Sequence, residues 1–460
     1  MTIGTTISVC PICLKTIPAE KIIKDNNHIY LDKTCPEHGS FSTLIWEGSL
    51  DSYRSWNRNS VISEPPINPN SEKNGCPNDC GLCEKHLRKG CCMLLELTNR
   101  CNLHCPVCFA SAGEQKPYDL SMEEIEKQYD FLMNHGGPFN IQLSGGEPTM
   151  RDDLPEIIRL GRSKGFTFFQ LNTNGIRLAE DSSYAKELKS AGLNTVFLQF
   201  DGLSDKTYEV LRGRPLLDEK LFAIRNCAAA GLGVVLVPVI APDVNELEIG
   251  HILHFALENM PAVRGVHFQP VSYFGRCNLE EPQTRITIPK MLKFIEEQTK
   301  GLMKQNDFGS GGAENPYCSF HASYMRRKDG SLKALAQKDS QCCCTTSDDS
   351  RTFVANQWDG VENTSASCCE VSAEESVSNC CCSKPSEESY VSEWNSLDEF
   401  LEQARLNTFT VSGMIFQDAF NLDLDRLKRC YICEVDSRYG MVPFCAYNLT
   451  DINGKSLYRK

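Results

Sequence analysis

Short apolar runs alternate with longer amphipathic segments from about residue 93 to residue 285. Apolar runs bounded by polar residues are typical of buried strands, and the segments between them place apolar residues at helical spacing. Six strands are predicted, at residues 93–98, 140–144, 166–172, 195–201, 233–240 and 265–271. Strands that alternate with helices indicate βαβ units, so the pattern predicts a parallel sheet covered by helices.

Helix start and stop signals lie between these strands. Ser121 and Glu124 form a capping box, and Gly136 supplies a stop signal. The apolar residues between them keep helical spacing: Met122, Ile125, Tyr129 and Leu132. Further helices are predicted near residues 153–164, 182–191 and 218–230, and they end at Gly165, Gly192 and Gly231.

Six strand–helix repeats are too few for a closed eight-fold barrel. They predict an α/β fold, a partial (β/α)6 TIM-like barrel, in which ligands bind at the carboxyl ends of the strands. Around this core the sequence predicts a metal-binding ribbon at 1–54, a linker rich in Asn, Ser and Pro at 55–75 and a cysteine-bearing segment at 76–92. The core itself spans 93–300, and a C-terminal extension that also carries cysteines follows at 301–339 and 391–460.

Residues 340–390 interrupt this order. They are dominated by Ser, Asp, Glu, Thr and Cys, they lack apolar periodicity, and they carry cysteine triplets at 342–344 and 380–382. A segment of this composition cannot bury enough apolar surface to fold, so a flexible insertion is predicted.

The N-terminal ribbon combines Cys10-Pro-Ile-Cys13 with Cys35-Pro-Glu-His38. Paired cysteines at this spacing are typical of knuckles that bind one zinc or iron ion. Cys10, Cys13 and Cys35 are the expected ligands, and His38 is the local candidate for the fourth. The alternative is that these cysteines are unliganded and lie in an ordinary loop.

Composition and charge narrow the range of possible functions and locations. A net charge of -13 and a pI near 5.3 argue against a nucleic-acid partner, since binding to phosphates is driven by Lys and Arg. The chain shows no signal peptide and no apolar stretch long enough for a transmembrane segment, so a cytoplasmic location is expected. In that compartment, 25 cysteines favour metal and redox chemistry over disulfides.

The spacing Cys-x3-Cys-x2-Cys occurs twice, at Cys76, Cys80 and Cys83 and again at Cys101, Cys105 and Cys108. Three such thiolates can hold three irons of a [4Fe–4S] cluster, and the ligand of the fourth iron decides what the cluster does. The first triad is followed by Cys91 and Cys92, either of which could close the site. The second lies on a predicted strand-to-helix loop with no nearby fourth cysteine, and it is the candidate for a reactive cluster with an open iron.

Polar residues follow the predicted strands at their carboxyl ends. They are Ser144-Gly145-Gly146-Glu147-Pro148, Asn172-Thr173-Asn174-Gly175, Gln199-Phe200-Asp201-Gly202 and Gln269-Pro270. Together with Cys101-Asn-Leu-His-Cys105-Pro-Val-Cys108-Phe109, they resemble the radical S-adenosylmethionine (SAM) superfamily.

This resemblance implies a reactive [4Fe–4S] cluster on the second triad. Its open iron would chelate the amino and carboxylate groups of SAM, and reductive cleavage would yield a 5′-deoxyadenosyl radical for C–H activation. An external electron donor of the ferredoxin or flavodoxin type is then implied. The residues implied to line the cofactor pocket are Phe109, Gly145, Gly146, Glu147, Pro148, Thr173, Asn174, Gln199, Val266 and Gln269, with Val266 and Gln269 near the adenine.

The ribbon, the first triad and the ending Pro443-Phe444-Cys445-Ala446-Tyr447 resemble the group of tetraether-lipid synthase and pterin methyltransferase-like enzymes. That group implies C–C bond formation or methyl transfer on a small-molecule or lipid-like substrate. It also implies two auxiliary [4Fe–4S] clusters. Their expected ligands are Cys76, Cys80, Cys83 and Cys91 for the first, and Cys318, Cys430, Cys433 and Cys445 for the second.

Two alternatives stay open. The cysteine triplets of the insertion resemble a branch of radical SAM selenoproteins or their cysteine forms, which suggests a substrate that carries a thiol or a metalloid. The non-enzyme alternative is an iron–sulfur electron carrier or metal sensor, although it gives the polar strand ends no role. Cys227 is expected in the core, Cys277 as a free thiol and His267 as a structural histidine.

Overall fold

The computed structural model describes residues 1–57, 63–113, 115–279, 285–311, 314–335 and 406–459, together with residues 351, 352, 355 and 358. The cysteine triplets at 342–344 and 380–382 lie outside the described residues, so the predicted role of the insertion stays a prediction.

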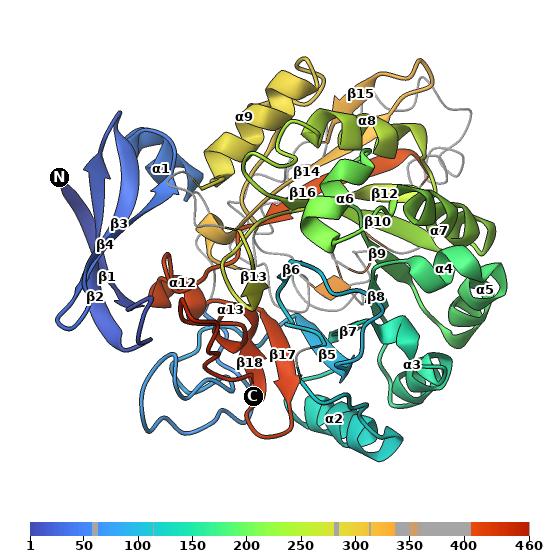
Figure 1. Cartoon of the computed structure of the whole chain (residues 1–460), viewed down its shortest axis with the longest axis horizontal. Coiled ribbons are helices and arrows are strands. Elements are labelled where there is room, and N and C mark those ends of the chain that lie inside the picture. The colour runs from blue at the N-terminus through green and yellow to red at the C-terminus, as the bar shows by residue number, and fades with distance from the viewer. Residues whose placement is uncertain are drawn as a thin grey trace, which may run out of the picture.

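The six predicted strands are present and form the centre of one large sheet (Figure 1). Each pairs in parallel with its neighbour, which confirms the partial barrel. In spatial order they are β5 (Cys92–Thr98), β7 (Asn140–Gly145), β8 (Phe169–Thr173), β9 (Thr195–Gln199), β10 (Gly233–Val237) and β12 (Val263–Pro270). The strand predicted at 233–240 is divided into β10 and β11 (Val239–Ile240) at Pro238, which has no N–H to donate.

The C-terminal region adds strands to both edges of this sheet. β16 (Thr408–Met414) pairs in parallel with β12, and β17 (Ile432–Asp436) pairs in parallel with β5. Antiparallel strands complete the edges: β14 (Ser319–Arg326), β15 (Leu332–Ala334) and β18 (Gly440–Pro443). The C-terminal cysteines therefore lie on or beside strands that are continuous with the barrel.

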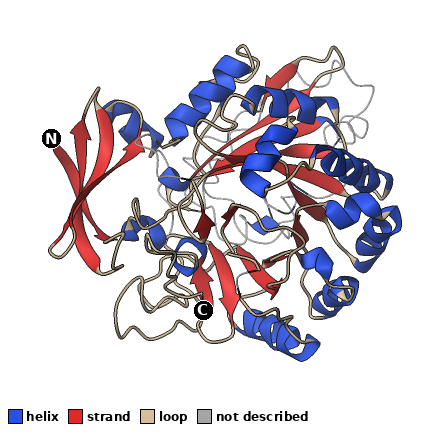
Figure 2. Cartoon of the chain, in the orientation of Figure 1, coloured by secondary structure: helices blue, strands red, loops and turns tan. Residues whose placement is uncertain are grey.

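Helices cover the outer face of the parallel strands (Figure 2). They are α2 (Met122–Asn134), α3 (Leu154–Ser163), α4 (Ile176–Glu180), α5 (Ser182–Ala191), α6 (Asp205–Arg212), α7 (Leu217–Ala229), α8 (Ile249–Glu258) and α9 (Ile288–Gln298). The capping box at Ser121 is present, with Glu124 bonded back to the Ser121 backbone. None of the described helices is both long enough and apolar enough to cross a membrane.

Strand alternation divides apolar from polar side chains. Leu143 and Leu171 belong to the apolar core that the helices cover. Gln142 and Asn172, one residue away on each strand, face the barrel interior, and the Asn172 amide donates to Gln142 Oε1 at 3.4 Å. A barrel with a polar interior leaves room for chemistry at its carboxyl end.

The N-terminal ribbon is a four-stranded antiparallel sheet that lies to one side of the barrel (Figure 1). Its elements are β1 (Thr2–Val9), β2 (Thr16–Lys24), β3 (His28–Cys35), β4 (Gly39–Trp46) and the short helix α1 (Leu50–Trp56). Asp423 joins it to the C-terminal region, since its carboxylate lies 2.7 Å from Lys21 Nζ and accepts a 2.7 Å hydrogen bond from Thr6.

Candidate active site

The second cysteine triad lies on the loop that follows β5. Within this loop, β6 (Val107–Cys108) pairs antiparallel with β13 (Arg276–Cys277). The Arg276 guanidinium donates to the Cys105 carbonyl at 2.7 Å and to the Ala112 carbonyl at 3.1 Å. The segment after β12, which contains β13 and Arg276, therefore holds the loop at the carboxyl end of the barrel.

The three thiols of this loop are close enough to influence one another. Burial, together with the charges of Glu147, Cys105 and Cys108, raises the pKa of Cys101 to about 12. Burial also raises the pKa of Cys105, while Arg212 opposes that shift. Protonated thiols in this environment become good ligands once a metal stabilises the thiolate. The donor set of three cysteines on one loop fits a [4Fe–4S] cluster whose fourth iron is open to another ligand.

Glu147 ties the ends of two strands together. It is 1% exposed, and its Oε1 accepts hydrogen bonds from Thr149 and, at 2.6 Å, from the Thr173 hydroxyl. Its Oε2 accepts from the Asn174 backbone N–H at 2.7 Å, and the Asn174 side chain donates to Asn102 in the cysteine loop at 2.7 Å. The structure thus brings three predicted pocket residues together beside the cysteine loop. Binding of a SAM amino group by Glu147 stays a prediction.

Gly145 and Gly146 allow the strand end to approach the cysteine loop closely. Gly145 has a φ of +128°, and an added Cβ would collide with the Thr98 carbonyl. An added Cβ at Gly146 would collide with the Arg100 carbonyl. Backbone hydrogen bonds of 2.8 Å join Gly146 to Thr98 and Glu147 to Arg100. Pro148 opens the short 3-10 turn that follows, Pro148–Met150.

Two basic residues near the cysteine loop were not predicted. Arg212 forms a buried ion pair with Asp201 and donates to the Val107 carbonyl at 3.1 Å. Lys220 is fully buried on α7, where its Nζ donates to the Asn174 carbonyl and, at 3.3 Å, to Gln199 Oε1. Burial lowers the pKa of Lys220 to about 8.

The sequence did contain a signal for Lys220. It lies one helical turn before Ala223 and Ile224, on the stripe that faces the core. Its acidic neighbours Asp218 and Glu219 give the local sequence the appearance of a solvated face, although Lys220 itself lies on the buried stripe.

The remaining predicted pocket residues lie on different faces of the barrel. Val266 is fully buried in the apolar core beneath the helices, so only its backbone can reach an adenine from the interior. Gln269 lies on the opposite face of β12. Phe109 follows the last cysteine of the loop and packs against Phe444, with ring centroids 5.5 Å apart. No described contact tests whether these residues bind a cofactor.

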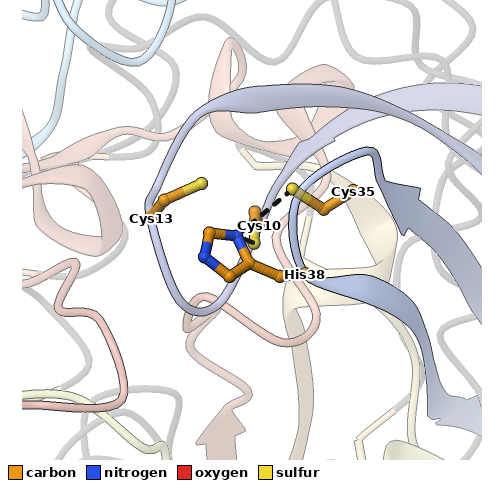
Figure 3. Close-up of side chains that lie close together, drawn as sticks. All are labelled: Cys10, Cys13, Cys35 and His38. Carbon is orange, nitrogen blue, oxygen red and sulfur yellow. Dashed lines mark hydrogen bonds between the residues drawn. The ribbon is translucent and has the colours of Figure 1, made fainter.

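The ribbon gathers its four predicted metal ligands. The ligand atoms of Cys10, Cys13, Cys35 and His38 all lie within 4.8 Å of one another (Figure 3). His38 Nδ1 lies 3.4 Å from Cys35 Sγ and 3.6 Å from Cys10 Sγ. Although burial acts to raise it, hydrogen bonds from the backbone and from His38 lower the pKa of Cys35 to about 7. Three thiols and one imidazole in this arrangement suit a tetrahedral zinc site.

Comparisons with known proteins agree with this geometry. The family model described as the radical SAM superfamily matches residues 95–256, and the one described as the HMPTM N-terminal zinc ribbon domain matches residues 2–47. The 7,8-dihydro-6-hydroxymethylpterin dimethyltransferase of Methanocaldococcus jannaschii is 36% identical over 477 residues, which cover 96% of this chain and 93% of that protein. The chain belongs to the radical SAM superfamily.

Other proteins match a smaller share of the chain. A GTP 3',8-cyclase of Paenarthrobacter nicotinovorans is 33% identical over 196 residues, 42% of this chain and 54% of that protein. The crystal structure of Streptococcus suis SuiB bound to the precursor peptide SuiA is 16% identical, with a TM-score of 0.40 over 47% of this chain and 46% of that one. The family model and the match over 96% of the chain show a radical SAM enzyme of the transferase type, and this family implies a [4Fe–4S] cluster and SAM.

Outside the core of this radical SAM enzyme, the first cysteine triad lines a small cavity. Cys76, Cys80 and Cys83 border it together with His86. Cys91, the predicted fourth ligand, is not among the lining residues. Its Sγ lies 3.8 Å from that of Cys92.

The C-terminal cysteines of the enzyme form a second group. Burial raises the pKa of Cys318, Cys430 and Cys445. The charge of Cys318 raises the pKa of Cys430 further, and the charges of Cys430 and Cys318 raise that of Cys445, so the three thiols lie close together. The Arg426 guanidinium donates two 3.5 Å hydrogen bonds to Cys318 Sγ. Cys433 lies on β17 with Cys430 as a charged neighbour. A cluster bound by these four cysteines stays a prediction.

Proposed function

We propose that this enzyme methylates a carbon atom of a pterin-like heterocycle. The observation that carries the proposal is the 36% identity with a 7,8-dihydro-6-hydroxymethylpterin dimethyltransferase over 96% of the chain. A match of that length includes the ribbon and the C-terminal strands, whereas the match to the GTP 3',8-cyclase covers 42% of the chain. Of the two expected reactions, it favours methyl transfer, which here forms a C–C bond.

The cysteine loop and the strand ends beside it suggest how the cluster and SAM would be bound. Cys101, Cys105 and Cys108 would hold a [4Fe–4S] cluster, which would supply the electron for reductive cleavage of SAM to methionine and a 5′-deoxyadenosyl radical. Glu147 holds the strand ends that frame the SAM pocket. Lys220 supplies a positive charge at the same strand ends, which suits an anionic group such as the SAM carboxylate.

A buried carboxylate inside the barrel supports a heterocyclic substrate. Glu434 lies on β17 and is 1% exposed, and neither carboxylate oxygen makes a well-formed hydrogen bond among the described residues, although the Asn448 side chain lies close enough to act on its pKa. Arg459 Nη2 lies 3.9 Å from its Oε1, but this guanidinium is already paired with both oxygens of Glu96. Glu434 therefore retains its acceptor capacity for another group.

The surroundings of Glu434 suit a flat aromatic ring. Leu94, its partner in the β5–β17 ladder, packs against Phe109, Phe274 and Phe444. A pterin offers two adjacent N–H donors on its aminopyrimidinone edge, and a carboxylate accepts such a pair through both oxygens. Burial raises the pKa of Glu434 well above its usual range, and a bound pair of donors would favour the ionised form.

The test is anaerobic reconstitution followed by reaction with SAM, a reductant and a reduced 6-hydroxymethylpterin. One SAM would give the 5′-deoxyadenosyl radical, which takes a hydrogen atom from the pterin carbon, and a second SAM would donate the methyl group and leave as S-adenosylhomocysteine, with two electrons supplied by the reductant. The expected products, measured by mass spectrometry, are 5′-deoxyadenosine, S-adenosylhomocysteine and a methylated pterin, and Cys105→Ala should abolish the formation of 5′-deoxyadenosine and of the methylated pterin. Cleavage of SAM without methylation of the pterin would contradict the proposed substrate and leave the radical SAM assignment in place. Glu434→Gln should weaken pterin binding with little change in SAM binding. A flavodoxin or ferredoxin in the cytoplasm is the proposed electron source.

A further inference from the structure

The cavity beside the first cysteine triad contains a nitrogen ligand that cysteine spacing alone does not reveal. Cys76, Cys80 and Cys83 lie on the segment between α1 and β5. Besides these three thiols, the cavity is lined by Glu72, Leu82, Lys85, His86, Leu427, Lys428 and Pro443. Among these residues, His86 offers an imidazole, a ligand that suits iron and could complete a set of four.

The hydrogen bonding of His86 leaves one ring nitrogen available. His86 is 5% exposed, and its Nε2 lies 2.7 Å from the Cys430 carbonyl oxygen. A carbonyl only accepts, so Nε2 carries the proton and Nδ1 carries the lone pair. In the described part of the chain, Nδ1 has no hydrogen-bond partner. Metal-bound histidines in proteins have this arrangement, with the second ring nitrogen donating to a backbone carbonyl.

The other candidates for the fourth ligand, Glu72 and Cys91, make contacts elsewhere. The Glu72 carboxylate lies 2.6 Å from Lys85 Nζ, and carboxylate oxygen is a hard ligand that suits iron–sulfur clusters less well than thiolate or imidazole. The backbone of Cys91 is fixed in the sheet, because its N–H donates to Tyr431 at 2.7 Å and its carbonyl accepts from Asn140 at 3.1 Å.

The side chain of Cys91 points to a different environment. Its thiol is fully buried, and the charged groups that influence its pKa are Cys92, Arg351 and Glu314. Its Sγ lies 3.8 Å from that of Cys92, and Cys91 is not among the residues that line the cavity.

We propose that His86 Nδ1, and not Cys91, is the fourth ligand of a [4Fe–4S] cluster held by Cys76, Cys80 and Cys83. Such a cluster has no open iron and serves electron transfer. A neutral imidazole in place of a thiolate lowers the negative charge of the site and raises its reduction potential. The hydrogen bond from Nε2–H to the Cys430 carbonyl joins this cluster to the C-terminal cysteine group. The inference does not depend on the substrate.

The test uses the full-length chain with Cys101, Cys105 and Cys108 all replaced by Ala, so that the reactive cluster does not contribute. After anaerobic reconstitution and reduction, pulsed electron paramagnetic resonance with isotopically labelled histidine reports nitrogen bound to a cluster. The variants His86→Cys, His86→Ala and Cys91→Ala are compared for iron and sulfide content and for this nitrogen coupling. Circular dichroism checks that each variant is folded.

A strong imidazole coupling is expected in the parent protein and in Cys91→Ala. It should be lost in His86→Cys, which keeps the full iron content and has a lower reduction potential. His86→Ala should lose iron. His38 is present in every variant, so a coupling from an iron-loaded ribbon would persist in His86→Cys. The proposal is overturned if the parent shows no imidazole coupling, if the coupling survives in His86→Cys, or if folded Cys91→Ala loses a cluster that His86→Ala retains.

Discussion

Asp201 and Arg212 form a two-pronged ion pair buried beneath the cysteine loop. Arg212 Nε lies 2.7 Å from Asp201 Oδ2, and Nη2 lies 2.8 Å from Oδ1. Asp201 has no exposed surface, and it also accepts from the Val239 N–H at 3.0 Å. The pair thus links β9, α6 and β11, and it places a positive charge beside Cys105.

Replacing one member of this pair should destabilise the enzyme strongly. Asp201→Asn leaves the buried Arg212 charge without its partner, and such changes cost about 3–5 kcal/mol of unfolding free energy. Urea unfolding of the apoprotein measures the loss. The matched control is Glu219→Gln, which removes the partly exposed pair with Arg214 and should cost less than about 1 kcal/mol. Equal losses in the two variants would contradict the buried pair's role.

The hydroxyl of Thr173 should matter for SAM binding through Glu147. Thr173→Val keeps the shape of the side chain but removes the 2.6 Å hydrogen bond to the buried carboxylate. A hydrogen bond to a charged group contributes about 1.5–3 kcal/mol, so SAM affinity should fall about tenfold or more. Equilibrium dialysis with the reconstituted enzyme measures this change. Thr173→Ser retains the hydroxyl and should bind SAM nearly as well as the wild type.

Local patterns predicted the barrel because its strands and helices are specified by nearby residues. The capping box at Ser121 and the alternation along β7 and β8 are signals of this kind. β16 and β17 were not foreseen, since their places beside β12 and β5 depend on pairing with strands more than a hundred residues away. Cysteine spacing likewise indicated Cys91 as a ligand, which stays a prediction, but spacing carries no information about the hydrogen bonding of His86 that the fold creates.

Acid should destabilise the protein through His267. Its Nδ1 lies 2.9 Å from the Ser412 hydroxyl, and burial lowers its pKa from 6.5 to about 4. The unfolded chain binds a proton below pH 6.5 while the folded chain does not. The stability contributed by neutral His267 is therefore complete above pH 6.5 and is lost as the pH falls toward 4.

The size of this effect can be isolated with His267→Gln. Between pH 7 and pH 5, the wild-type apoprotein should lose about 2 kcal/mol more unfolding free energy than the variant. Urea titrations at the two pH values give both numbers. A variant with the same pH dependence as the wild type would show that His267 titrates normally.

Removing one ribbon thiol should release the ribbon metal without affecting the clusters. Cys13→Ala leaves two thiols and His38, too few donors for a closed structural site. Metal analysis should show the loss of one metal ion per chain, and hydrogen exchange should increase in β1 to β4 because metal binding contributes to folding. Cys277→Ala, which removes a thiol outside the predicted ligand groups, should retain the metal. Retention of the metal by Cys13→Ala would contradict the four-ligand site.

A methyl group at Gly146 should separate the strand end from the cysteine loop. The added Cβ would overlap the Arg100 carbonyl, so the backbone must shift, and the 2.8 Å hydrogen bond from the Glu147 N–H to that carbonyl must lengthen. Overpacking of this kind costs about 1–3 kcal/mol. Because the same shift displaces Glu147 from Thr173 and Asn174, SAM affinity should fall at least tenfold in Gly146→Ala, while the ribbon metal is retained.

Gly4→Ala is the control, because a Cβ there meets no atom within 4 Å. Dialysis against SAM and metal analysis measure the two effects, and normal SAM binding by Gly146→Ala would show that the loop does not need this close approach.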